Sequence, residues 1–79
     1  NLIRAEVYGE IQQAILSLPA GCRNVINLAY FDGLKNEEIA NRLQVSVNTV
    51  KTQKQRGLQL LRLRLRTDAF FLLFTVLLA

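Results

Sequence analysis

The hydrophobic positions of this chain recur at steps of three and four, which is the spacing of amphipathic helices. Pro19 separates the first two predicted helices, because proline ends one helix and fits the first turn of the next. The turn signal Asp32-Gly33 ends the second. We therefore expect an all-α fold, a small helical bundle. The predicted helices span about residues 2–17, 19–31, 36–43 and 46–66.

The third and fourth predicted helices form a helix-turn-helix pattern. Only Gln44 and Val45 separate the third helix from Ser46, so the two helices must cross steeply. Asn36 is expected to cap the third helix and Ser46 the fourth. The second helix of such a pair is presented outward, toward a groove of DNA. The residues expected to hold the two helices together are Ile39, Ala40, Leu43, Ser46 and Val50.

The distribution of charge favours the same kind of partner. The net charge is +4, and no acidic residue lies between Ile39 and Thr67. Basic strips bind phosphate backbones by releasing counterions. The alternative is that these side chains only solvate a long helix. The basic residues of the strip are Arg42, Lys51, Lys54, Arg56, Arg62, Arg64 and Arg66.

Composition argues against most enzymes. The chain has no His and a single cysteine, Cys22, so it lacks the residues for a catalytic triad or a Cys/His zinc site. We expect no catalytic residues, no metal and no cofactor. Cys22 lies at helical spacing with apolar neighbours and is predicted to be a small buried hydrophobe in a cytoplasmic protein. The chain begins at Asn1 and has no Met, so we expect it to be part of a longer protein.

A string of spaced residues across three helices also resembles a known family. These residues are Leu18-Pro19, the run Tyr30-Phe31-Asp32-Gly33-Leu34, Glu38-Ile39-Ala40 and Thr49-Val50-Lys51. With them, the chain resembles region 4, the C-terminal helix-turn-helix domain of bacterial sigma-70-type factors, a winged-helix-like fold. The extracytoplasmic-function group is the most similar.

The resemblance implies a function and a set of partners. Residues 1–66 would form a domain that binds the −35 element of double-stranded promoter DNA and docks on the β flap of core RNA polymerase to initiate transcription. An anti-sigma factor is a further candidate partner.

The resemblance also assigns residues to the DNA. The chemistry of the side chains agrees in part, because Asn48 or Gln55 could make paired hydrogen bonds to adenine and Lys51 could reach the acceptors of guanine, but it does not determine which base each residue reads, and Asn48 could instead be a local cap. The residues expected to contact phosphates could equally carry solvated side chains that make no DNA contact. The implied base contacts, which share one helix face, are Val47, Asn48, Lys51, Thr52 and Gln55. The expected phosphate contacts are Arg42, Lys54, Arg56 and Arg62.

Two positions depart from the family pattern. Gln44 stands where the turn usually has glycine, and a left-handed backbone there would cost on the order of 1 kcal/mol. Gln53 and Lys54 replace one arginine and one apolar residue of the family, so the inner face of the fourth helix is thin at this point.

Residues 67–79 form an apolar segment that we expect to be helical. It is shorter than the roughly 20 residues that a membrane-spanning helix needs, so we expect no membrane span. A helix that is apolar on all sides must be buried somewhere. The segment either packs on the first two helices or pairs with a second copy as a dimer. The alternatives are contact with polymerase or an inhibitory partner, or a truncated membrane anchor.

Two other functions share part of this pattern. The DNA-binding output domain of a two-component response regulator has the same Glu-Ile-Ala and Thr-Val-Lys core. A helical protein-interaction module without DNA binding would explain the polar inner face of the fourth helix. The amphipathic helix before Leu18-Pro19 and the basic extension past Leu58 favour the sigma domain.

Overall fold

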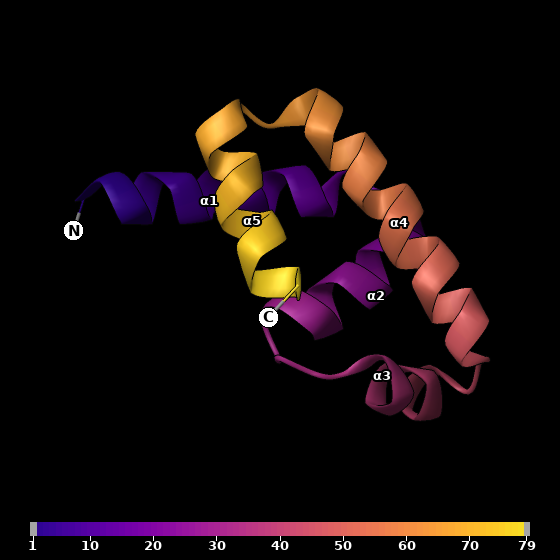
Figure 1. Ribbon diagram of the computed structural model, residues 1–79. Coiled ribbons are helices and arrows are strands. Elements are labelled where there is room, and N and C mark those ends of the chain that lie inside the picture. Colours follow the sequence, from indigo (N-terminus) through magenta and orange to yellow (C-terminus); the bar gives the residue numbers. More distant parts are fainter. Residues whose placement is uncertain (1, 79) are drawn as a thin grey trace.

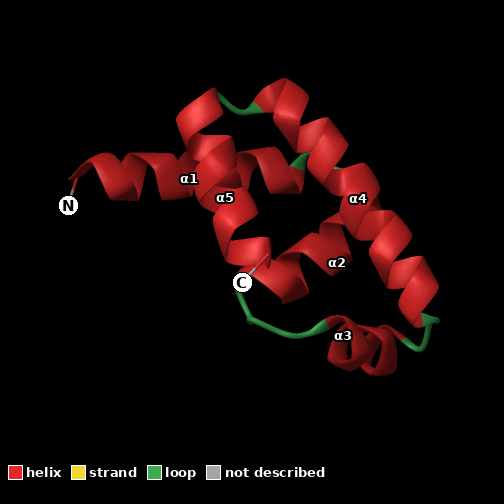
Figure 2. Ribbon diagram, in the orientation of Figure 1, coloured by secondary structure: helices red, strands yellow, loops and turns green. Residues whose placement is uncertain are grey.

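A computed structural model describes residues 2–78, which form five α-helices and no strands. The all-α prediction is confirmed, and the four helix ranges expected from periodicity differ from these by at most two residues at each end. Figure 2 shows how short the connections between the helices are. The helices are α1 (Leu2–Leu16), α2 (Ala20–Tyr30), α3 (Asn36–Leu43), α4 (Val47–Arg64) and α5 (Thr67–Leu78).

The last helix folds back over the first part of the chain. Helix α4 starts beside α3 and runs along α2, and after a sharp turn at Leu65 and Arg66, α5 crosses α1 and ends beside α2 (Figure 1). Ala69 and Leu73 of α5 are fully buried. The structure therefore shows that the apolar segment packs against the first two helices, which was one of the alternatives. No helix within residues 2–78 is long and apolar enough to cross a membrane.

A first hydrophobic cluster joins α1, α2, α4 and α5. Its α1 members lie on the stripe that the sequence predicts, and Cys22 is buried among them, as expected. Burying a large aliphatic side chain contributes about 1.5–3 kcal/mol, so this cluster is the main source of stability. The buried residues of the cluster are Val7, Ile11, Ile15, Leu18, Cys22, Ile26, Leu61, Ala69 and Leu73.

Helix α4 packs closely against α2 at Gly57. A Cβ atom built on Gly57 would lie 2.9 Å from Cγ1 of Ile26 and 3.5 Å from Cβ of Cys22. The glycine lies inside a helix, where it costs about 1 kcal/mol relative to alanine. The close contact with α2 explains why a residue without a side chain occupies this position.

We expect Leu73→Ala to lower the free energy of unfolding by about 2–5 kcal/mol, because Leu73 fills the space between α5 and α1. Leu72→Ala is the matched control, since Leu72 is the neighbouring residue and is exposed. Its expected loss is less than about 1 kcal/mol. Urea denaturation followed by circular dichroism measures both. Equal losses in the two variants would contradict the placement of α5.

Candidate nucleic-acid interface

The N-cap of α3 lies one residue before the expected cap, Asn36. Lys35, with an extended backbone, is the N-cap, and its N–H donates to Oε1 of Glu38 at 2.9 Å. Glu37 and Glu38 lie in the first turn, where the helix dipole favours negative charge. The prediction that Asn36 caps α3 is therefore wrong. Asn36 is the first helical residue, and its side chain accepts a hydrogen bond from α4 instead.

The turn between α3 and α4 contains the left-handed residue anticipated from the family pattern. Gln44 has φ 57° and ψ 48°, and it ends α3. The N–H of Val45 donates to the carbonyl of Ala40 at 3.0 Å, which satisfies one of the last carbonyls of the helix. The turn is retained with glutamine at a position that favours glycine.

Ser46 caps α4, as predicted. Its Oγ accepts a hydrogen bond from the N–H of Thr49 at 3.0 Å and lies 2.9 Å from Oγ1 of Thr49. The cap satisfies one of the free N–H groups at the start of α4. The first turn of α4 is therefore fixed directly after the bend.

A second hydrophobic cluster fixes the angle between α3 and α4. It joins both helices to α2, and its fully buried members in the helix-turn-helix are Ile39 and Val50. Ala40 is also buried, and Leu43 packs against the cluster while half-buried. These positions are the ones expected to hold the two helices together, with Ser46 as the exposed cap.

The inner contacts leave a polar face of α4 exposed. Asn48, Lys51, Thr52 and Gln55 are all exposed and lie at helical spacing on one side of α4. Val47, the fifth expected base contact, is half-buried and packs against the second cluster. The structure thus brings four of the five expected side chains to one accessible surface.

The four expected phosphate contacts do not share one environment. Arg42, at the last turn of α3, and Arg56 and Arg62 on α4 are exposed. Lys54 is half-buried, and its Nζ donates to Oδ1 of Asn36 at 2.6 Å. Burial lowers the pKa of Lys54, because it penalises the charged ammonium. Lys54 joins α4 to the start of α3.

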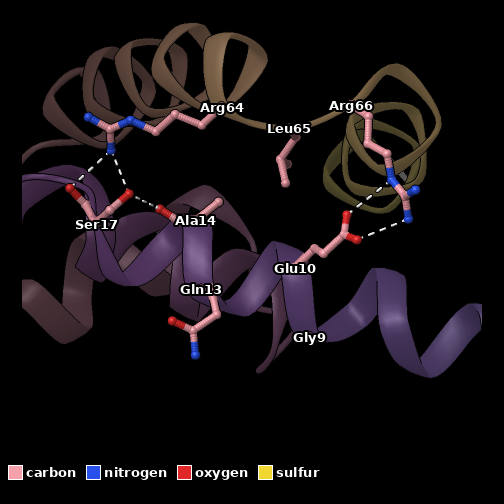
Figure 3. A pocket seen from close by; sticks show the side chains of 8 residues that line it. All are labelled: Gly9, Glu10, Gln13, Ala14, Ser17, Arg64, Leu65 and Arg66. Atoms are coloured by element: carbon pink, nitrogen blue, oxygen red, sulfur yellow. Dashed lines mark hydrogen bonds and ion pairs between the residues drawn. The ribbon is translucent and has the colours of Figure 1, made fainter.

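Arg64 and Arg66, at the C-terminal end of the basic strip, are bonded to α1 and to the residue that follows it. Nη1 of Arg64 donates to the carbonyl of Ser17 at 3.0 Å and to its Oγ at 2.6 Å. Arg66 forms an ion pair with Glu10 at 3.0 Å (Figure 3) and lies 3.7 Å from Asp68. The basic strip contains no acidic residue in the sequence, but the fold places the carboxylate of Glu10 beside its last arginine. The other exposed basic residues of the strip form no such bond within the part of the chain that the structure describes. They are Arg42, Lys51, Arg56 and Arg62.

The polar residue Gln53 also has an intramolecular partner that the sequence did not indicate. Its Oε1 accepts a hydrogen bond from Sγ of Cys22 at 3.1 Å. The same amide lies over Gly21, where an added Cβ would be 3.1–3.3 Å from Gln53. Gln53 and Lys54 thus replace apolar packing on this part of α4 with specific polar contacts to α2 and α3.

Comparison with known proteins agrees with this geometry. The family described as "Sigma-70, region 4" matches residues 8–61, which include most of α1, all of α2 and α3, and most of α4. The chain belongs to the sigma-70 region 4 family. Arg62 and α5 lie beyond the matched residues of this region 4 domain.

Two curated proteins of Bacillus subtilis (strain 168) are similar to the chain. The ECF RNA polymerase sigma factor SigW is 45% identical over 65 residues, covering 82% of this chain and 35% of SigW. The RNA polymerase sigma factor SigV is 39% identical over 59 residues, covering 75% of this chain and 36% of SigV. The chain thus spans about a third of the length of these relatives. No solved structure gave a significant match.

We expect Gln44→Gly to raise the free energy of unfolding of the region 4 domain by about 0.5–1 kcal/mol. Glycine relieves the left-handed strain, and the larger entropy that it loses on folding offsets part of the gain. Gln44→Ala keeps the Cβ atom and should stay close to the parent. Thermal and urea denaturation measure the difference, and a glycine variant no more stable than the alanine variant would contradict strain at this turn.

Proposed function

We propose that this region 4 domain binds the −35 element of promoter DNA, with α4 as the recognition helix in the major groove. The observation that carries the proposal is the exposed polar face of α4, formed by Asn48, Lys51, Thr52 and Gln55, on a helix whose inner face is fixed by Val50. A major groove admits one α-helix, and amide and amine side chains are suited to base edges.

The side chains of this face differ in what they can bind. Gln55 and Asn48 carry amides that can pair with the two hydrogen-bonding groups of adenine, and Lys51 can donate to the acceptors of guanine. The methyl group of Thr52 can contact the methyl group of thymine. Val47 is half-buried and packs against the second cluster, so only the exposed part of its side chain can contact a base.

Phosphate contacts would orient the helix in the groove. Arg42 on α3 and Arg56 and Arg62 on α4 are exposed, and none forms an ion pair with an acidic side chain among the residues that the structure describes. Such contacts give affinity and register without sequence preference. The ammonium of Lys54 already has a partner in Asn36, so we assign Lys54 to the support of the α3–α4 angle.

We also propose that the domain acts as part of a sigma factor, in complex with core RNA polymerase through its β flap, in the cytoplasm. The names of both relatives support this proposal and favour it over a response regulator. The role is binding without catalysis. An anti-sigma factor stays a prediction that rests on the family resemblance alone.

Arg56→Ala should weaken binding to two duplexes of unrelated sequence by similar factors. It should also reduce the slope of log binding constant against log salt concentration by about one unit, because one phosphate contact is lost. Fluorescence anisotropy titrations at several salt concentrations measure both effects. The parent chain should prefer the duplex that carries a −35 element.

Arg64→Ala is the matched control, because it removes the same charge from the same helix. Its guanidinium is bonded to Ser17, outside the proposed interface, so the salt slope should stay at the parent value. A slope that falls equally in both variants would indicate only a general effect of net charge. No change in Arg56→Ala would remove Arg56 from the interface.

A further inference from the structure

Helix α5 links the two hydrophobic clusters through Leu77, which lies in its last turn. Among the partly buried side chains that the structure describes, Leu77 is the one that packs against both clusters. The first cluster holds α5 to α1, and the second holds α3 and α4 to α2. The C-terminal end of α5 lies beside the end of α2, from which the chain leads into α3 (Figure 1). A residue outside the region 4 match therefore reaches the helix-turn-helix.

A hollow of about 350 Å³ lies between this end of α5 and the start of α3. Val76 and Leu77 form part of its wall on α5 and Ala29 on α2, and all three side chains are apolar. Asn36 and Lys54 line the same hollow, where Nζ of Lys54 donates to Oδ1 of Asn36 at 2.6 Å. The hydrogen bond that joins α3 to α4 thus lies at a hollow that α5 helps to enclose.

The apolar wall strengthens this hydrogen bond. A charged donor bonds more strongly than a neutral one, and a low local dielectric strengthens the bond further. Burial already lowers the pKa of Lys54, so water is in part excluded from its ammonium. The other charged residues that line the hollow are Lys35 and Glu37, both exposed at the start of α3, and the lining residues of α2 and α5 carry no charge. What α5 adds to the surroundings of Lys54 is therefore the exclusion of water.

We propose that Leu77 is a positioning residue for α4. By enclosing the hydrogen bond between Lys54 and Asn36, Leu77 holds the angle between α3 and α4 that the recognition helix needs. Lys54 is half-buried on the inner side of α4, whereas the polar face is exposed, so Leu77 acts through this bond and not by touching DNA. The inference rests on the proposed binding of DNA by α4 and adds a role for α5 to it.

Leu77→Ala should raise the dissociation constant for duplex DNA about three- to tenfold, as expected for one weakened hydrogen bond. The reason is that a domain which holds the binding geometry for part of the time binds more weakly by that fraction. The slope of log binding constant against log salt concentration should stay at the parent value, because no phosphate contact is lost. Fluorescence anisotropy titrations of the 79-residue chain measure both quantities.

Two variants serve as controls for the loss of the side chain. Leu72→Ala removes the same side chain from an exposed position of α5 and should bind DNA like the parent. Leu77→Met keeps an apolar side chain of similar volume and should bind within about twofold of the parent. Circular dichroism of each variant checks that the helices are retained.

Two further measurements separate this role from a general loss of stability. An NMR titration should show a higher pKa of Lys54 in Leu77→Ala than in the parent, because water then reaches the ammonium and the charged form is penalised less. Leu72→Ala should keep the parent's value. In a chain that carries Lys54→Met, which removes the ammonium, adding Leu77→Ala should not weaken DNA binding further.

An unchanged pKa of Lys54 in Leu77→Ala would overturn the proposal, since Leu77 would then not enclose the bond. A raised pKa with the parent's DNA affinity would also overturn it, because the bond would then not position α4. So would an equal effect of Leu77→Ala with and without the ammonium of Lys54. A parent chain that binds no duplex would contradict the proposed function and this proposal with it, so the parent's own binding distinguishes the two failures.

Discussion

The close contact of α4 with α2 at Gly57 determines where the proposed DNA-binding face lies. On either side of this contact, α4 buries Val50 in one hydrophobic cluster and Leu61 in the other, so the helix is held at two points and pressed against Ile26 between them. With its inner face packed in this way, α4 exposes its opposite face to solvent. Alanine at position 57 would favour the helix by about 1 kcal/mol, yet its Cβ would collide with Ile26.

Polar contacts add to this arrangement in the middle and at the C-terminal end of α4 and divide its basic residues into two groups. Lys54, half-buried in the middle of the helix, bonds to Asn36 at the start of α3, and Arg64 bonds to Ser17 at the C-terminal end. The exposed contact of Arg64 contributes at most about 1 kcal/mol, so apolar packing is what mainly holds the helix. The arginines that remain exposed and unpaired, such as Arg56, are available to phosphates.

The helices and the bend were predictable because their signals are local. A period of three to four residues located the helices, and Ser46 with its hydroxyl located the start of α4. Local signals did not separate Lys35 from Asn36 as the cap of α3, since the carboxylate of Glu38 and not the side chain at the cap makes the bond. The partners of Lys54, Arg64 and Arg66 lie 18, 47 and 56 residues away, where no sequence spacing indicates them. The apolar segment had no polar side, so its pattern could not show which face is buried.

If the exposed polar face of α4 recognises bases, Lys51 lies at the middle of the recognition surface. Selection of preferred sites from random duplex DNA by the parent and by Lys51→Ala tests this role. The variant should lose about 1–3 kcal/mol of discrimination at one or two adjacent base pairs and keep the preferences elsewhere. Arg64→Ala, whose side chain is bonded to Ser17, should select the parent's sites. Identical preferences in Lys51→Ala and the parent would contradict the claim and place base recognition on another surface.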